Sequence, residues 1–253
     1  MGKIRAIAIN TFREGIRNRI MYNLVFFALV MIVFSYFVGE VSLGDKLKVM
    51  QDMGLSAISI FGILIAIFVG IGLVYKEVDK RTIYTIISKP IERYQFLLGK
   101  FFGLALMLFV QVVFMALFFF LVLYLTTNIF NPELFKSLVL IYMELLVIVS
   151  IALFFSSFTT PFLSALFSIG FFIVGHSTEE LYAIGTKSKN PVLEGATKFV
   201  HYYNLDHFNI TGKLVHGVNI GWDWVFEIFF YGIFLVLIFL ICASLIFEKR
   251  DFK

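Results

Sequence analysis

Six long apolar segments separated by polar connections constrain the fold of this chain more than any other feature. A helix needs about 20 apolar residues to cross the roughly 30 Å hydrocarbon core of a bilayer. Apolar segments near this length lie at residues 20–39, 55–75, 100–125, 134–155, 161–175 and 224–247, and the fifth is the shortest. They lack the two-residue alternation of lipid-facing barrel strands, and in lipid a helix satisfies its own backbone polar groups. The sequence therefore predicts an all-α membrane protein with six transmembrane helices.

The composition agrees with the membrane class and excludes several others. Of the 253 residues 60% are hydrophobic and 15% are charged, whereas soluble domains carry about 25% charged residues. Basic residues lie beside apolar segments and form no polar basic face, so no nucleic-acid partner is expected. The single cysteine, Cys242, excludes an intrachain disulfide and a C-x-x-C site. We expect one domain over residues 1–253, with the first span retained and not cleaved as a signal peptide.

The distribution of basic residues predicts the orientation. Residues 1–19, the connection from 76 to 100 and the tail after 247 together hold 14 of the 21 Lys and Arg residues. Positively charged connections stay on the cytoplasmic side of a membrane. With six spans these three segments lie on one side, so we expect both termini to be cytoplasmic.

The connecting segments also carry helical patterns. Ile4, Ile7, Phe12 and Ile16 form one apolar stripe among basic residues, which favours an N-terminal helix in the membrane interface over a plain charged flank. On the outer side, Leu43, Leu47 and Met50 have helical spacing and predict a short surface helix. The largest outer loop spans 176–223, and within it 192–203 is predicted to be a helix lying on the membrane.

No motif of a soluble enzyme is present. The chain lacks a phosphate-binding G-x-x-x-x-G-K-[ST] loop, H-E-x-x-H and G-x-S-x-G. His176, His201, His207 and His216 fall in the outer loop, but their spacing matches no zinc pattern. We therefore predict no catalytic residue and no metal site in this chain.

Two acidic residues and one amide fall within apolar segments. An ionised acid at the centre of a span costs about 2.5–3.5 kcal/mol on insertion scales, so Glu144 should face a polar interior. It is either a substrate or gating contact, or a hydrogen-bond partner of Gln111 or a serine. Glu227 lies one turn inside the last span beside Trp222 and Trp224, and is interpreted as an interfacial acid in the aromatic belt.

Small residues recur every four positions in two places. Gly62, Ala66 and Gly70 follow this spacing in the second span, and Gly99 and Gly103 at the start of the third. Such stripes let helix backbones approach closely. The pattern fits packing within one subunit and fits a dimer seam equally well.

The connection from 76 to 100 is the longest highly charged segment between two spans. Ile83, Ile86 and Ile87 share one helical face, preceded by Val78, and Pro90 ends the helix. A short amphipathic helix between two spans suits docking into a groove of a soluble partner. The same pattern also suits a helix lying on the lipid surface.

The residues of this connection resemble the signature of ABC-2 type transporter permeases. The matching residues are Glu77, Arg81, Thr82, Ser88, Pro90, Ile91, Arg93, Phe96, Leu97, Gly99 and Lys100. The sequence departs mildly, with Ile87 where Leu is common and Lys89 separating Ser88 from Pro90. Residues 10–14 look like the elbow helix of these permeases. Residues 201–217 look like a loop of the multicopper-enzyme-maturation subgroup, although Asn204 replaces its proline.

The resemblance implies a permease without enzymatic activity, coupled to a separate ABC ATPase that holds the ATP and Mg. The coupling site would comprise Glu77, Val78, Arg81, Thr82, Ile83, Ile86, Ile87, Ser88, Pro90 and Arg93 within a cytoplasmic loop at 76–99. A second copy or a paralogous permease would complete the pore in the inner membrane of a bacterium or archaeon, usually for export. The outer loop is a candidate contact for a periplasmic or lipoprotein partner. The alternatives are a channel or signalling scaffold, and an intramembrane enzyme using Glu144 or the histidines.

Overall fold

The computed structural model describes residues 2–42, 45–79, 92–187, 195, 197–198, 200 and 202–249, and over these it is helical with no strand. The elements are α1 (Gly2–Ile16), α2 (Arg19–Val41), α3 (Lys46–Asp79), α5 (Arg93–Thr127), α6 (Leu134–Ser156), α7 (Pro161–His176), α8 (Thr178–Lys187), the 3₁₀ helix η1 (Asp206–Phe208), α10 (Thr211–Val215) and α11 (Trp222–Lys249). The predicted all-α class is confirmed.

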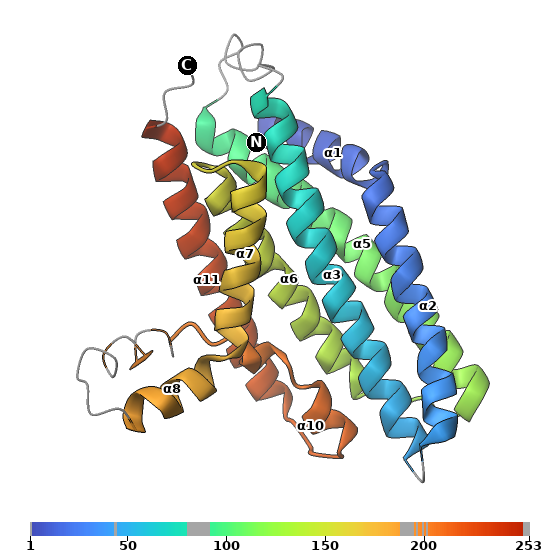
Figure 1. The fold of residues 1–253 in the computed structure, drawn as a ribbon. Helices are drawn as coiled ribbons and strands as arrows, with labels where there is room; N and C mark the ends of the chain where they lie inside the picture. The colour runs from blue at the N-terminus through green and yellow to red at the C-terminus, as the bar shows by residue number, and fades with distance from the viewer. Residues whose placement is uncertain are drawn as a thin grey trace.

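Within the described ranges, five helices are long and apolar enough to cross a membrane, namely α2, α3, α5, α6 and α11. The segment predicted at 161–175 lies in α7, whose 16 residues extend for about 24 Å. Helix α8 follows at a bend of 65°, and the described helices make five spans, or six if this bent pair is one broken span and not a re-entrant loop. Figure 1 shows these helices side by side, with α1 and the C-terminal end of α11 at the same end of the molecule.

The helix ends differ from the edges of the apolar segments. Helix α3 begins at Lys46, so Leu47 and Met50 belong to its first turns, and the separate surface helix predicted there is wrong. Met50 is 1% exposed. Helix α5 begins at Arg93 and not near residue 100, because good helix formers and no proline lie between these positions.

Helix α6 is the centre of the bundle. It packs against α3, α5, α7 and α11 (Figure 1), and most of its side chains are buried. Large apolar side chains instead lie exposed along the outer helices, among them Phe26 and Phe34 on α2 and Phe230 and Phe234 on α11. A continuous exposed apolar periphery is what a lipid-facing surface requires.

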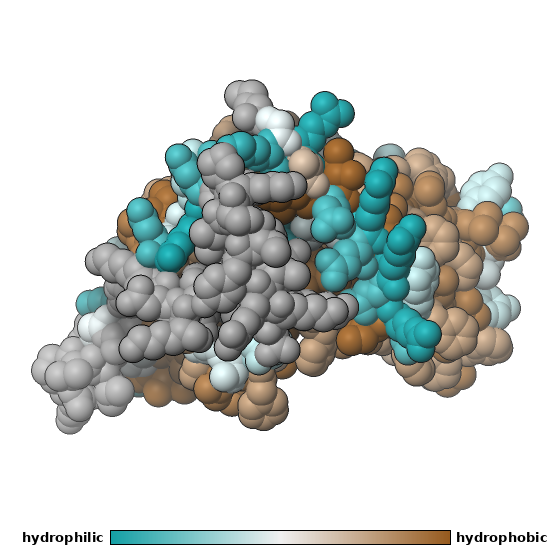
Figure 2. Space-filling model, turned by 90° about the horizontal axis from the view of Figure 1, so that it is seen from above, coloured by the Kyte–Doolittle hydropathy of each residue, from teal (hydrophilic) through white to brown (hydrophobic). Residues whose placement is uncertain are grey.

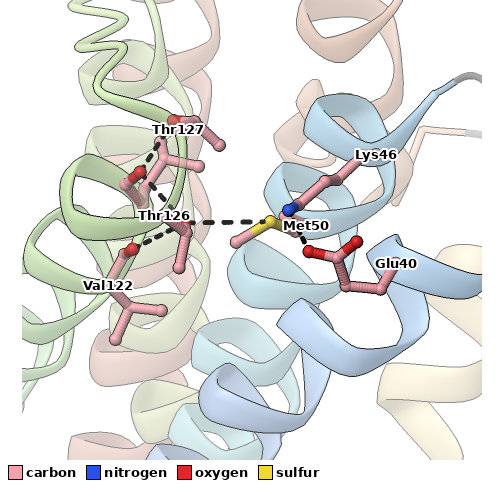
Figure 3. Close-up of polar contacts among 7 residues, drawn as sticks. Glu40, Lys46, Met50, Val122, Thr126 and Thr127 are labelled. Carbon is pink, nitrogen blue, oxygen red and sulfur yellow. Dashed lines mark hydrogen bonds and ion pairs between the residues drawn. The ribbon is translucent and has the colours of Figure 1, made fainter.

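The C-terminal ends of α2 and α5 and the N-terminal end of α3 meet at the end of the molecule opposite α1 (Figure 1), and Figure 3 shows their polar contacts. Glu40 and Lys46 form an ion pair across the α2–α3 turn, and Lys46 Nζ also lies 4.7 Å from the centre of the Tyr36 ring. On α5, Thr126 donates a hydrogen bond to the Val122 carbonyl at 2.7 Å. The Thr126 hydroxyl lies 4.0 Å from the Met50 sulfur, which brings the start of α3 against the end of α5.

Helix α1 packs directly on α5, across the direction of the long helices (Figure 1). A Cβ added to Gly99 would lie 2.7 Å from Ile7 Cβ, and one added to Gly103 would lie 2.5 Å from the Ala8 carbonyl oxygen. The inner face of α1 includes the buried Thr11 and Gly15. The glycines at the start of α5 thus lie against a helix of the same chain.

The second small-residue stripe also lies within the chain. A Cβ on Gly62 would be 2.9 Å from Leu145 of α6, Ala66 is fully buried, and the nearest atom to a Cβ on Gly70 is in Leu104 at 3.8 Å. The spacing fitted either packing within one subunit or a dimer seam. In this structure both stripes pack against helices of the same chain.

Candidate functional site

The end of the molecule that carries α1 also carries the last turns of α3 and the start of α5, which flank the predicted ATPase-coupling segment in the sequence. Glu77 and Val78 lie in the last turns of α3, which continues to Asp79. Arg93 is the first residue of α5. The other predicted coupling residues, Arg81, Thr82, Ile83, Ile86, Ile87, Ser88 and Pro90, lie outside the described residues.

Arg93 joins the start of α5 to the end of α11. Its Nη1 donates hydrogen bonds to the carbonyl oxygens of Phe247 at 2.9 Å and Glu248 at 2.8 Å. These carbonyls belong to the last turn of α11, where helix carbonyls have no partner within the helix and a cation is favourable. Phe96 stacks on Phe247 with 6.0 Å between ring centres. The start of α5, which follows the predicted coupling segment in the sequence, is therefore held against the end of α11 by hydrogen bonds and ring stacking.

Replacing Arg93 by glutamine is expected to loosen the end of α11, because two charge-assisted hydrogen bonds are lost. We expect amide exchange in the last two turns of α11 to become about tenfold faster, which corresponds to about 1.4 kcal/mol. Hydrogen–deuterium exchange with mass spectrometry measures this. Arg13→Gln, which changes an exposed arginine on α1, is the matched control and should leave α11 unchanged. Equal exchange rates in the two variants would show that the Arg93 hydrogen bonds do not stabilise the end of α11.

Basic side chains gather on this end of the molecule. Lys3, Arg5, Arg13, Arg17 and Arg19 are all exposed there, and Figure 2 shows hydrophilic side chains on the face seen from this end, with apolar surface around it. Such a face suits contact with anionic headgroups or a soluble partner.

Lys100 differs from the other basic residues near this end. It is fully buried between α3 and α5, where its Nζ donates to the Leu73 carbonyl at 3.4 Å and lies 5.7 Å from the centre of the Phe96 ring. Lys100 thus contributes to helix packing, although the sequence analysis counted it among the basic residues of the charged connection.

A second candidate site is a row of three titratable side chains that leads inward from the surface. Glu144 on α6 is 2% exposed, and its Oε1 lies 2.8 Å from His176 Nε2 at the end of α7. The other ring nitrogen, Nδ1, lies 3.7 Å from Asp206 Oδ1 in η1. The Asp206 side chain is 47% exposed, so the three residues lead from the surface to a buried carboxyl group.

The partner of Glu144 corrects the sequence interpretation. The hydrogen-bond alternative for Glu144 suggested Gln111 or a serine as its partner, but Gln111 directs its Nε2 to Met115 Sδ at 3.5 Å. His176 was interpreted as an ordinary loop histidine. A signal for the pair does exist in the sequence, because Glu144 and His176 are similarly distant from the turn at 157–160 and therefore come to the same level of a helical hairpin.

A cavity of about 210 Å³ adjoins this pair. Its polar lining consists of Ser56, Ser59, Glu144, His176, Asn209 and Thr211, from α3, α6, α7, the segment before α10 and the first residue of α10. Hydroxyl, amide, imidazole and carboxyl groups around one space can hold a small polar group or exchange a proton. The cavity is therefore the polar interior that a carboxyl group within a span requires.

A family model described as ABC-2 family transporter protein matches residues 5–252. The chain belongs to the ABC-2 transporter family. Comparison with curated proteins found no significant match.

The family match covers the whole set of helices, from α1 to α11. This ABC-2 family member is thus a multi-pass transmembrane subunit of an ABC transporter, which is a non-catalytic subunit type. The charged connection, most of helix α1 and the Glu144–His176 pair all lie within the residues that the family model matches.

The remaining candidate residues of the ABC-2 subunit lie apart from these sites. Glu227 is exposed on α11. His207 follows Asp206 in η1, His216 follows α10, and His201 lies outside the described residues. In the part of the chain that the structure describes, no three His, Cys, Asp or Glu residues form a group able to hold a metal ion.

Proposed function

We propose that this chain is the permease subunit of an ATP-driven exporter and that residues 76–99 couple it to a separate ABC ATPase. The observation that carries the proposal is the match of the family model over residues 5–252. ATP and Mg would bind to the ATPase chain, and a second copy or a paralogous permease would complete the transporter. The α1 end would face the cytoplasm of a bacterial or archaeal inner membrane.

Two observations support this placement of the ATPase. The last turns of α3, the start of α5, helix α1 and the end of α11 all meet at one end of the molecule (Figure 1). The exposed basic residues of α1 are at the same end, as the bias of positive charge towards the cytoplasm predicts. Movement imposed on the segment after α3 would pass through Arg93 to α11, because Arg93 binds the last carbonyls of that helix.

The test is coupling of ATPase activity in the reconstituted complex. The tagged chain is purified from native membranes with its ATPase, and hydrolysis by the complex is compared with that of the ATPase alone. Replacing both Ile86 and Ile87 by aspartate should abolish the stimulation, because charges on the apolar face prevent docking into a groove. The chain itself should still insert and accumulate in the membrane.

Ile184→Asp is the matched control. Ile184 is 65% exposed on α8, at the end of the molecule opposite α1 (Figure 1). This variant makes the same chemical change away from the proposed docking site, and stimulation should be retained. Normal stimulation in the Ile86/Ile87 variant, or failure of any ATPase to copurify, would refute the coupling proposal.

A further inference from the structure

A cavity lies at the start of α11, at the end of the molecule opposite α1. Its volume is about 400 Å³. Tyr202, Asn204 and His207 line it from the segment before α10, and Trp224, Glu227 and Tyr231 line it from α11. Neither the family match nor the coupling proposal gives this cavity a role.

Hydrogen bonds hold the two walls of the cavity together. The Tyr231 hydroxyl on α11 donates to the Tyr202 carbonyl at 2.9 Å and accepts from the Asn204 backbone N–H at 3.0 Å. The Asn204 side-chain oxygen accepts from the Asp206 N–H at 2.8 Å, which fixes the orientation of the amide. The cavity is thus built into the fold and is not a gap between loosely packed side chains.

The lining favours a positively charged guest. Glu227 supplies a carboxylate that is exposed to the cavity and pairs with no cationic side chain among the described residues. Tyr202, Trp224 and Tyr231 add aromatic rings, whose faces attract cations. Lys213 Nζ already lies 5.3 Å from the centre of the Trp224 ring, so Tyr202 and Tyr231 supply the aromatic rings for a bound cation.

One donor in the lining lacks a partner. Asn204 is 1% exposed, and its Nδ2 has no hydrogen-bond partner in the described part of the chain. A buried amide donor left unsatisfied costs about 1–3 kcal/mol. A ligand with a positive charge and a nearby oxygen acceptor would pair with the Glu227 carboxylate and place its acceptor on the Asn204 side of the cavity.

From these features we infer that the cavity binds an organic ammonium group that carries an oxygen acceptor nearby. A divalent metal ion fits poorly, because Glu227 is the single carboxylate among the lining residues. An anion fits poorly because the same carboxylate repels it. The ammonium group belongs to a soluble amine or to a phospholipid headgroup, since Trp224 lines the site and interfacial aromatic residues lie at the depth of the headgroups.

The experiment uses the full chain in nanodiscs made of phosphatidylglycerol alone, which contains no amine. Choline and ethanolamine are titrated in separately, and tryptophan fluorescence is recorded, since Trp224 lines the cavity and the chain has one other tryptophan, Trp222. In a second arm, the chain is purified from membranes containing phosphatidylethanolamine, and retained lipid is identified by native mass spectrometry.

Four variants connect the signal to the cavity. Glu227→Gln keeps the shape and removes the charge, so affinity should fall about tenfold or more. Tyr202→Leu should weaken binding about two- to fivefold by removing an aromatic face, whereas Tyr202→Phe should retain it. Asp223→Asn is the matched control, because Asp223 is an exposed acid in the first turn of α11 that does not line the cavity.

The arms separate the two sources of the amine. Saturable quenching by choline or ethanolamine that Glu227→Gln weakens supports a soluble amine. Selective retention of phosphatidylethanolamine, lost in Glu227→Gln and without binding of the free amines, supports a headgroup. The inference is overturned if neither arm shows binding, or if Glu227→Gln and Asp223→Asn behave alike. This result is independent of ATPase coupling, which is measured at the opposite end of the molecule.

Discussion

Gly103→Ala is expected to destabilise the protein by about 1–3 kcal/mol or more, the range for overpacking a close contact. The new methyl group would lie 2.5 Å from the Ala8 carbonyl oxygen and 2.6 Å from Thr11 Cβ. A carbonyl oxygen of the backbone cannot rotate away as a flexible side chain can, so α1 has to move off α5. We expect a lower unfolding temperature in detergent and faster proteolysis of residues in α1.

Gly72→Ala and Gly170→Ala are the matched controls for this prediction. Both glycines lie within helices, and nothing lies within 4 Å of a Cβ added at either position. Alanine in a helix interior is favoured over glycine by about 0.5–1 kcal/mol, so these variants should be unchanged or slightly stabilised. If Gly103→Ala behaves like the controls, α1 does not pack against α5 as closely as described.

The contact between α1 and α5 could be predicted only in part from the sequence. The apolar stripe of α1 was predicted from Ile4, Ile7, Phe12 and Ile16, but the inner face also uses the buried Thr11. Close approach of two backbones depends on small side chains, and hydrophobic spacing does not measure size. The spacing of the glycines predicted a close helix contact. Only the structure identifies α1 as the helix that packs against them.

The spans were predictable because hydrocarbon demands a minimum apolar length, and α2 and α6 follow the apolar segments closely. The ends of α3 and α5 were not predictable in this way. A helix continues beyond the hydrocarbon wherever its polar residues are good helix formers, as Lys46 and Lys48 are at the start of α3. Apolar length therefore reports the thickness of the membrane and not the ends of the helices.

The sequence predicted one residue of the buried polar site, Glu144, but not its partner. The cost of an acid in a span singled out Glu144, and the structure adds that His176 is its partner. That pairing depends on the rotation of α6 and α7 about their axes, and on a segment thirty or so positions further along that brings Asp206 close. The proposed coupling residues between 81 and 90 remain predictions, since they lie outside the described residues.

His176→Leu is expected to destabilise the protein more than the double change of His176 and Glu144 to leucine. The single variant leaves a carboxyl group that is 2% exposed without its partner, and breaking a buried pair from one side costs about 3–5 kcal/mol. The double variant removes both polar groups, and replacement of a buried pair by apolar residues is often neutral. Unfolding free energies of the two single variants and the double variant form a cycle that measures the coupling.

Gln111→Leu is the control for this cycle, because Gln111 is also buried within a span, at 5% exposure, but has no charged partner in the described contacts. It should change stability by less than His176→Leu. Equal losses in the His176→Leu and double variants would show that the pair is not coupled.

The double variant also separates the two interpretations of Glu144, because its expected stability is near that of the unchanged protein. If ATPase stimulation by the permease is retained, the Glu144–His176 pair only holds α6 to α7. If stimulation is lost while stability is retained, the carboxyl group itself takes part in transport, since packing has been preserved. The cavity of about 210 Å³ between Ser56, Glu144 and His176 favours the second outcome, because a pair that served packing alone would need no polar space beside it.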